Sequence, residues 1–217
     1  MNKFKSLDEV LDLIKDGQTI MVGGFLAVGT PEKLIDGIVK KGVKDLTIIC
    51  NDTGYPDRGV GKLVLNGQVK KVIASHIGTN PETGRRMNTG EMEVELCPQG
   101  SLAERIRSGG AGLGGVLTPT GLGTVVAEGK PVIEVDGKPY LLEKPLKADI
   151  ALVGGSVVDK KGNVWYNKAT RNFNPLIATA ADVVIVEAEK VVEVGEIEPE
   201  NVMTPHIFVK YIVGRAE

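Results

Sequence analysis

The sequence predicts an α/β fold, an open and mostly parallel sheet flanked by helices, with a small antiparallel hairpin as an appendage. Short β-branched apolar runs recur along the chain and alternate with segments of helical apolar spacing. Glycine or polar turn residues separate these runs, and only the stretch around Asp136-Gly137 has the pattern of a hairpin. The 217 residues suffice for one substantial α/β core, so we expect residues 1–217 to form a single domain.

The composition argues against several partners. A formal net charge of −2 offers no basic field for nucleic acid, and no apolar run approaches the ~20 residues of a membrane span. The first residues lack the apolar segment of a secretory signal, so we expect a cytoplasmic protein. Cys50 and Cys97 form no CxxC pair, and His76 and His206 lie far apart, so we expect neither a disulfide nor a metal site.

The N-terminal part predicts two strands joined through a helix. A capping box at residues 6–9 begins a first helix, and residues 19–22 form a buried strand. Thr30 is the expected N-cap of the next helix, with Pro31 at its first position, and Gly42 ends it. Residues 46–50 are the second strand, which should run parallel to the first.

The glycine loop between that first strand and its helix is the first candidate site. Gly23 and Gly24 break the strand, and bare backbone would let a ligand approach closely. The helix start after Pro31 would present unpaired N–H groups to an anion. Ligands of open α/β sheets bind at the carboxyl ends of strands, where Asn51 also falls. The alternative is a tight strand-to-helix connection without a ligand.

The middle of the chain continues the pattern. We expect a short helix near residues 59–65, a strand over 69–77 and a solvated polar loop over 78–86. In the alternating strand that follows, Glu91, Glu93 and Glu95 should share a solvent face.

The next helix and loop supply the second candidate site. Residues 101–104 predict a capped helix, and Gln99 lies between the preceding strand and this helix, a place suited to a polar ligand group. Residues 110–115 satisfy G-x-G-x-x-G but follow a helix, whereas a dinucleotide fingerprint follows a strand. We therefore expect a flexible loop there rather than an NAD site.

The C-terminal part predicts a hairpin over residues 132–142 and buried strands at 150–153 and 183–186. A last apolar segment covers residues 206–213.

The opening stretch resembles the signature of the type I coenzyme A transferases, in the segments Asp16-Gly17, Ile20-Met21-Val22, Gly23-Gly24-Phe25 and Gly29-Thr30-Pro31. Later segments resemble the same family in chain order: residues 51–53, 90–96, 98–107, 109–112, 118–121 and 171–174. They cover nearly the whole chain, and the resemblance is to the α subunits of its acetate and butyrate–acetoacetate members.

This resemblance implies a three-layer sandwich and a ping-pong reaction that moves coenzyme A between short-chain acyl-CoA and a carboxylic acid. In the family the attacking glutamate, which forms a glutamyl-CoA intermediate, lies in a β subunit within Ser-Glu-Asn-Gly. The present sequence lacks that tetrapeptide. The resemblance thus implies a β-subunit partner in an α2β2 assembly, with coenzyme A as a substrate and no permanently bound cofactor.

The resemblance also implies roles for residues of this chain. The loop facing coenzyme A would comprise Gly24, Phe25, Leu26, Ala27, Val28, Gly29 and Thr30. Gln99 would donate its amide to the acyl or carboxylate group, with Asn51 as a neighbouring polar contact. The structural alternatives are that Asn51 closes a turn and that Gln99 caps the following helix.

Two other functions stay open. A sugar-phosphate isomerase on the same kind of sheet would need a carboxylate–lysine site within this chain and activity without a partner. A ligand-binding module would have kept the fold and lost the chemistry.

Overall fold

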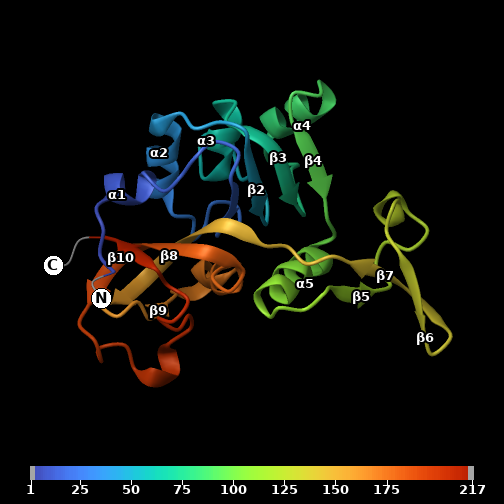
Figure 1. Cartoon of the computed structure of the whole chain (residues 1–217). Coiled ribbons are helices and arrows are strands. Elements are labelled where there is room, and N and C mark those ends of the chain that lie inside the picture. Colours follow the sequence, from blue (N-terminus) through green and yellow to red (C-terminus); the bar gives the residue numbers. More distant parts are fainter. Residues whose placement is uncertain (1–2, 215–217) are drawn as a thin grey trace.

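The computed structural model describes residues 3–214 (Figure 1). Residues 1–2 and 215–217, the ends of the expected 1–217 domain, lie outside it. The helices are α1 (Leu7–Leu11), α2 (Glu32–Lys41), α3 (Val60–Leu65), α4 (Pro81–Asn88), α5 (Gln99–Gly110) and α6 (Asn174–Ile177), with 3₁₀ turns at Val125–Ala127, Lys168–Arg171 and Pro199–Asn201.

The strands form two sheets. They are β1 (Thr19–Val22), β2 (Leu46–Cys50), β3 (Val69–Ala74), β4 (Glu93–Leu96), β5 (Val116–Thr118), β6 (Val132–Val135), β7 (Lys138–Glu143), β8 (Ala148–Asp159), β9 (Val164–Trp165), β10 (Ala181–Val192) and β11 (Tyr211–Val213). The large sheet has the order β11-β10-β8-β1-β2-β3-β4, with β9 paired to β8, and the small one has the order β5-β7-β6. In the large sheet every pairing is parallel except that of β9. The predicted α/β fold is confirmed.

Two cores cover the two faces of the large sheet, which gives three layers. Along β1, Ile20 and Val22 face the core built with α1, α2 and α3, whereas Met21 faces the core built with α5 and α6. Figure 1 shows these helices on opposite sides of the strands. Period-two side-chain alternation thus buries both faces, as continuous apolar strands of parallel sheets require.

The caps of α1 and α2 agree only in part with prediction. The Ser6 capping box is present, and Gly42 ends α2 in the left-handed region at φ 74°. The predicted cap by Thr30 is wrong, because Pro31 occupies the N-cap position and no side chain of the cap bonds the helix. The Thr30 hydroxyl lies instead over Gly24, where an added Cβ would come within 2.0 Å of Oγ1.

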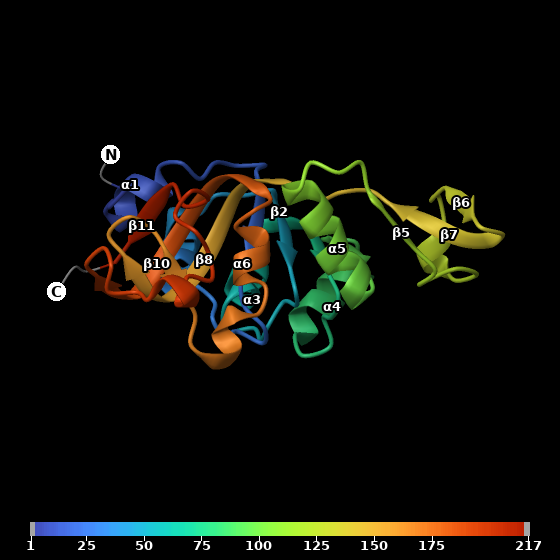
Figure 2. The same cartoon turned by 90° about the horizontal axis from the view of Figure 1, so that it is seen from below.

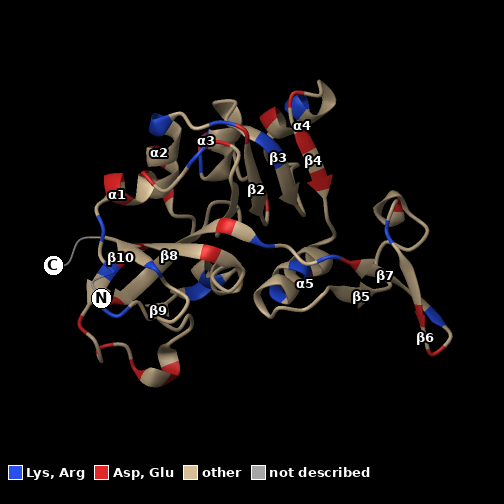
Figure 3. Cartoon of the chain, in the orientation of Figure 1, with Lys and Arg blue, Asp and Glu red and all other residues tan. Residues whose placement is uncertain are grey.

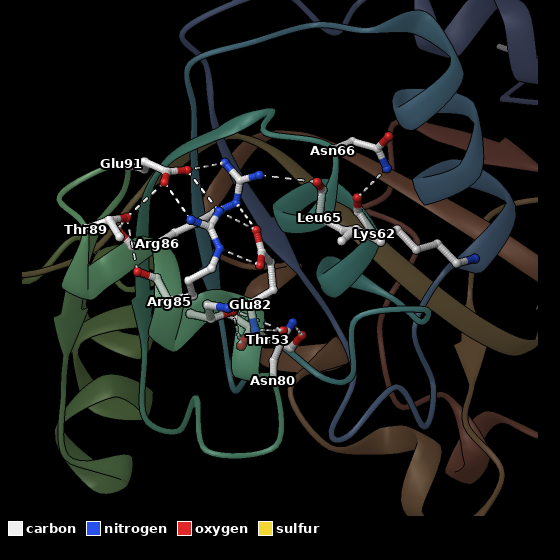
Figure 4. Close-up of polar contacts among 11 residues, drawn as sticks. Thr53, Lys62, Leu65, Asn66, Asn80, Glu82, Arg85, Arg86, Thr89 and Glu91 are labelled. Atoms are coloured by element: carbon white, nitrogen blue, oxygen red, sulfur yellow. Dashed lines mark hydrogen bonds and ion pairs between the residues drawn. The ribbon is translucent and has the colours of Figure 1, made fainter.

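The predicted polar loop over residues 78–86 is wrong: it contains α4. Asn80 is the N-cap, and its Oδ1 accepts hydrogen bonds from the backbone N of Glu82 and Thr83 at 3.2 and 3.4 Å. Asn80 Nδ2 also donates to the carbonyl of Thr53 at 3.0 Å (Figure 4). Asn80-Pro81 is itself a helix-start pattern, an N-cap followed by proline at the first position.

Arg85 and Arg86, which fall in the loop predicted to be solvated, both join an ion-pair network. Arg85 bonds Glu82 at 2.8 Å and Glu91 at 2.6 Å, and Arg86 bonds Glu82 at 2.7 Å (Figure 4). Hydrogen bonds from Arg85 lower the pKa of Glu82 and of Glu91 to about 2. The network joins the two ends of α4 on the surface.

The strand β4 is confirmed, but its glutamates are paired rather than merely solvated. Glu95 bonds Arg105 on α5 at 2.6 Å, and Glu93 bonds Lys71 on β3 at 2.7 Å. Figure 3 shows blue and red segments side by side on β3, β4 and α4. The charges of this sheet edge therefore compensate one another.

The predicted cap of α5 at Ser101 is wrong. The helix begins at Gln99 after Pro98, and Ser101 lies buried in its first turn, with a hydroxyl that has no hydrogen-bond partner within the described chain.

The two cysteines, Cys50 and Cys97, are buried free thiols.

The predicted hairpin is confirmed as β6 and β7, and β5 adds a third antiparallel strand. Asp136 and Gly137 have φ values of 51° and 72°, as a two-residue hairpin turn of the primed type requires. This small sheet projects beyond α5, away from the large sheet (Figure 2). Arg105 ties it to the body by donating Nε to the carbonyl of Lys144 at 3.0 Å.

The C-terminal strands extend the predicted ones. The predicted runs at 150–153 and 183–186 are parts of the twelve-residue strands β8 and β10. The predicted strand over 69–77 ends at Ala74, and only Tyr211–Val213 of the last apolar segment is a strand. Within residues 3–214, no helix has the length and apolar character that crossing a bilayer requires.

Candidate functional site

Three strand ends of the large sheet bring polar side chains together. Asn51 follows β2, Ser75 follows β3 and Gln99 follows β4, and these strands are neighbours in the sheet. Gln99 Nε2 donates a hydrogen bond to Asn51 Oδ1 at 2.7 Å. The structure thus joins the two residues that the sequence singled out, although they lie 48 positions apart.

The orientation of both amides follows from a neighbouring carboxylate. Asn51 Nδ2 donates to Asp52 Oδ2 at 2.7 Å, and an ionised carboxylate can only accept. The Asn51 side-chain oxygen must therefore face Gln99, and the Gln99 side-chain nitrogen must donate to it. Gln99 Oε1 then faces the hydroxyl of Ser75 at short distance. The bond to Asn51 uses one of the two hydrogens on Gln99 Nε2, and the exposed position of Gln99 offers the other to a ligand.

The two structural alternatives for these residues are wrong. The first turn of α5 has no side-chain cap bond, so Gln99 does not cap that helix. The turn after β2 is closed by Asp52, whose Oδ1 accepts from the backbone N of Gly54 at 2.7 Å. The Asn51 side chain instead hydrogen-bonds Asp52 and Gln99, and Asn51 is almost fully buried.

The loop after β1 folds into a tight turn of its own. The backbone N and O of Phe25 bond the O and N of Val28 at 3.1 and 2.9 Å. Leu26 and Ala27, between them, have φ values of 47° and 67°, a region that costs non-glycine residues energy. The Asp52 carboxylate supports this turn by accepting from Leu26 N at 3.0 Å. About half of the surface of Phe25 and Val28 is exposed, so the turn presents apolar side chains outward.

Two asparagines hold the base of this loop. Asn172 accepts from Gly24 N at 3.1 Å and donates to the Val28 carbonyl at 2.9 Å. Asn174 donates to the Gly29 carbonyl at 2.9 Å. Sequence reasoning gave neither asparagine a role, and the signal that pointed to them was the resemblance of residues 171–174 to the family.

The glycines of the loop serve these contacts within the chain. A Cβ on Gly23 would come within 1.8 Å of Asn174 Oδ1, and one on Gly29 within 2.6 Å of the Thr170 carbonyl. The expectation that bare backbone is present for a ligand is therefore wrong at these two positions. Beneath the loop lies a cavity of only about 10 Å³, lined by Ala27, Thr30, Asp52 and their neighbours. Such a space holds one water at most, so a ligand would contact the outer side of the turn.

The start of α2 is not open to an external anion, contrary to expectation. Glu187 on β10 reaches it, and its carboxylate accepts from the backbone N of Lys33 and Leu34 at 3.3 and 2.9 Å. Burial raises the pKa of Glu187, and the two N–H bonds partly offset this rise. The positive end of the helix dipole is thus neutralised by the chain itself.

A larger groove lies between α5 and β5, directly after Gln99 along the chain. Its volume is about 450 Å³, and Gly100, Ser101, Arg107 and Thr118 are among its lining residues. Among residues 3–214, no group of three or more histidine, cysteine or acidic side chains could hold a metal ion.

The glutamates that flank Gln99 in the sequence form ion pairs with basic side chains. Glu91, Glu93, Glu95 and Glu104 pair with Arg85, Lys71, Arg105 and Arg107, respectively. Across residues 3–214, no hydrogen bond joins a glutamate to Asn51 or Gln99. The second hydrogen of the Gln99 amide can bond a carbonyl or carboxylate oxygen, and no glutamate of the described chain competes for the two amides by a hydrogen bond. The contacts of Asp52 likewise include no lysine within the described chain, so the carboxylate–lysine site of an isomerase is not found there.

An open α/β sheet with an amide pair at its carboxyl edge is an arrangement that can bind an acyl or carboxylate oxygen. Comparison with known proteins identifies the family: the chain belongs to the Coenzyme A transferase family, whose model matches residues 4–215.

The curated relatives match along the whole chain. The chain is 55% identical over 215 residues to the acetate CoA-transferase subunit alpha of Escherichia coli K12, covering 99% of this chain and 98% of that protein. It is 56% identical over 212 residues to the acetoacetyl-CoA:acetate/butyrate CoA transferase alpha subunit of Clostridium acetobutylicum, covering 98% and 97%.

Solved structures share the fold at low sequence identity. An acyl-CoA transferase of Escherichia coli O157:H7, solved as a thioester complex with CoA, superposes with a TM-score of 0.87 at 23% identity, covering 99% of this chain. The present chain spans only 47% of that enzyme. Glutaconate coenzyme A-transferase of Acidaminococcus fermentans superposes with a TM-score of 0.84 at 20% identity, covering 99% and 76%.

Proposed function

We propose that this chain is the α subunit of a coenzyme A transferase that acts on short-chain acyl-CoA and on acetate, butyrate or acetoacetate. The observation that carries the proposal is the Gln99–Asn51 amide pair at the sheet edge, with no attacking glutamate beside it. The two curated relatives, 55% and 56% identical, are named as alpha subunits acting on these acids.

The proposed reaction has two halves. A glutamate carboxylate of the β subunit attacks the thioester carbonyl of acyl-CoA, the C–S bond breaks, and a mixed anhydride and CoA thiolate result. The thiolate then attacks the glutamyl carbonyl and releases the first acid, which leaves a glutamyl-CoA thioester. The second acid reverses both steps. One thioester bond replaces another, so no external energy source is needed.

Gln99 supports these steps as an amide donor. Negative charge develops on the carbonyl oxygen during each attack, and the second hydrogen of Gln99 Nε2 would bond that oxygen. One such donor in a dry site is worth roughly 3 kcal/mol of barrier. Asn51 keeps the Gln99 amide in the donating orientation through the 2.7 Å bond.

The loop from Gly24 to Thr30 would face coenzyme A. Its exposed Phe25 and Val28 offer apolar contact to the non-polar parts of that substrate, rather than an anion site at α2. Coenzyme A thus enters as a substrate and leaves with the product, and the expected setting is the cytoplasm.

A β subunit that carries the catalytic glutamate completes the site, in an α2β2 assembly. The test is to purify this chain alone and together with a candidate β subunit, and to assay acetyl-CoA with acetoacetate. Activity that appears only on mixing supports the proposal. Isomerase activity of the chain alone would support the isomerase alternative, and no activity in either sample would favour the binding module.

A further inference from the structure

We propose that Asp52 is a positioning residue, which sets the amide orientation of the Asn51–Gln99 pair and the conformation of the Leu26–Ala27 turn through one carboxylate. This inference rests on the proposed function. The residue is buried, with 7% of its surface exposed, and it lies between the loop after β1 and the amide cluster.

Three hydrogen bonds converge on the Asp52 carboxylate. Oδ2 accepts from Asn51 Nδ2 at 2.7 Å and from Leu26 N at 3.0 Å. Oδ1 accepts from Gly54 N at 2.7 Å. All three partners are donors, so the position requires an acceptor on both oxygens, which an ionised aspartate provides and an asparagine does not.

The first consequence concerns amide orientation. The nitrogen and oxygen of an asparagine side chain have nearly the same shape, so only hydrogen bonds decide which way it points. Because the Asp52 carboxylate accepts on both oxygens, the Asn51 nitrogen is bound to it and the Asn51 oxygen is directed at Gln99. A reversed Asn51 would direct its nitrogen at Gln99, which would then turn its own oxygen inward and lose the fixed donor.

The second consequence concerns the loop. Leu26 and Ala27 occupy the left-handed region, which disfavours residues that carry a Cβ. The bond from Leu26 N to Asp52 opposes that cost. Because the same Oδ2 also bonds Asn51, the apolar turn and the amide cluster are held in one fixed relation.

Asp159 provides a matched control. It is also buried, at 2% exposed, and its Oδ1 accepts from the backbone N of Lys161, Gly162 and Asn163. Its Oδ2 accepts from Asn163 Nδ2 at 2.8 Å. The same chemistry thus closes the turn between β8 and β9, where these bonds reach neither Gln99 nor the loop after β1.

The test compares Asp52→Asn, Asp159→Asn and Gln99→Ala in the complex with the β subunit, by kcat and by KM for acyl-CoA. We expect Asp52→Asn to lower kcat by about tenfold or more, by analogy with residues that orient metal ligands, whose loss costs roughly 10–100-fold in activity. The double variant Asp52→Asn/Gln99→Ala should be no slower than Gln99→Ala alone, because both changes remove the same donor. Asp159→Asn should lower the Tm and leave kcat within about twofold.

A second readout does not need transferase activity. In the full chain, the side-chain amide NMR signals of Gln99 can be assigned by their loss in Gln99→Ala. They should shift or broaden in Asp52→Asn and remain in place in Asp159→Asn. Unchanged signals would overturn the positioning role, as would kcat losses that multiply in the double variant. An inactive wild-type complex would sink only the proposed function, because the NMR comparison still decides the role of Asp52.

Discussion

Glu187 on β10 accepts a hydrogen bond at 2.9 Å from the backbone N of Leu34, which lies 153 positions earlier in the first turn of α2. The bond places an anion of the chain itself at the positive end of the helix. It also ties β10 to the segment that follows the glycine loop. The start of α2 is therefore a structural joint between this helix and β10, and not a phosphate site.

This joint predicts a specific pH dependence. Burial raises the pKa of Glu187 above its ordinary value of 4.5, so the folded chain binds this proton more tightly than the unfolded chain does. Proton binding by Glu187 therefore adds to the free energy of unfolding. This contribution is complete below pH 4.5 and is lost as the pH rises through the pKa of the folded state. Glu187→Gln removes this titration. The free energy of unfolding of the wild type, minus that of the variant, should decline above pH 4.5 in denaturant titrations. A difference that rises with pH would contradict this assignment.

Gln99→Ala should lower turnover while the subunit complex stays intact. The loss of one donor to the developing oxyanion predicts a fall in kcat of about 10²-fold. Gln99 is exposed, so the Tm should change little.

A second glutamine provides the control. Gln68 is buried and donates Nε2 to the carbonyls of Ile38 and Val43 at 3.0 and 2.9 Å. Gln68→Ala should cost about 2 kcal/mol of stability and leave kcat unchanged. Equal kcat at saturating substrate for Gln99→Ala and the wild type would refute the donor role.

Gly23→Ala should disrupt the clamp on the glycine loop. The new Cβ would meet Asn174 Oδ1 at 1.8 Å, so Asn174 must leave its bonds to Gly29 and Gly154. We expect a loss of about 3 kcal/mol in chemical denaturation, in the range of overpacking combined with lost buried hydrogen bonds. Gly84→Ala, within α4 and with open space around it, should instead be neutral or stabilise by up to about 1 kcal/mol. Equal stability of the two variants would contradict the clamp.

Arg105→Met should weaken the attachment of the small sheet to the body. Arg105 is buried and bonds Glu95 at 2.6 Å and the Lys144 carbonyl at 3.0 Å. Arg105 Nε also lies 3.8 Å from Glu143. Both acidic neighbours keep another cation, since Lys71 lies 3.4 Å from Glu95 and Lys130 lies 2.7 Å from Glu143. The expected loss is therefore about 2 kcal/mol, below that of an orphaned buried charge.

The comparison for this variant is Arg107→Met, two residues later on the same helix. Arg107 pairs with Glu104 in an exposed position, so its replacement should cost less than about 0.5 kcal/mol. Limited proteolysis should cut near the small sheet faster only in Arg105→Met. Equal effects of the two changes would show that burial of Arg105 does not matter.

Local patterns were sufficient to predict most of the framework from sequence. The strands β1 and β2, the Ser6 capping box, the Gly42 helix end and the Asp136-Gly137 turn each depend on neighbouring residues only. The missed helix α4 was also local, because Asn80-Pro81 begins it. That error came from giving the turn-forming residues more weight than the helix-start pattern.

Other features could not follow from local pattern, because they depend on distant contacts. Glu187 fills the start of α2 from across the sheet, and Asn172 and Asn174 clamp a loop about 145 positions earlier. The pairing of Gln99 with Asn51 needed the strand order. Sequence marked the two amides as candidates, and the parallel sheet explains why they meet.

The most direct test of the account is the intact mass of both subunits after brief exposure to acetoacetyl-CoA without an acceptor acid. A β subunit that carries the nucleophile should gain the mass of coenzyme A less one water, as a glutamyl-CoA thioester requires, and the present chain should keep its own mass. A coenzyme A adduct on the 217-residue chain, formed in the absence of any partner, would contradict the claim that this chain binds and polarises the substrate while another attacks it.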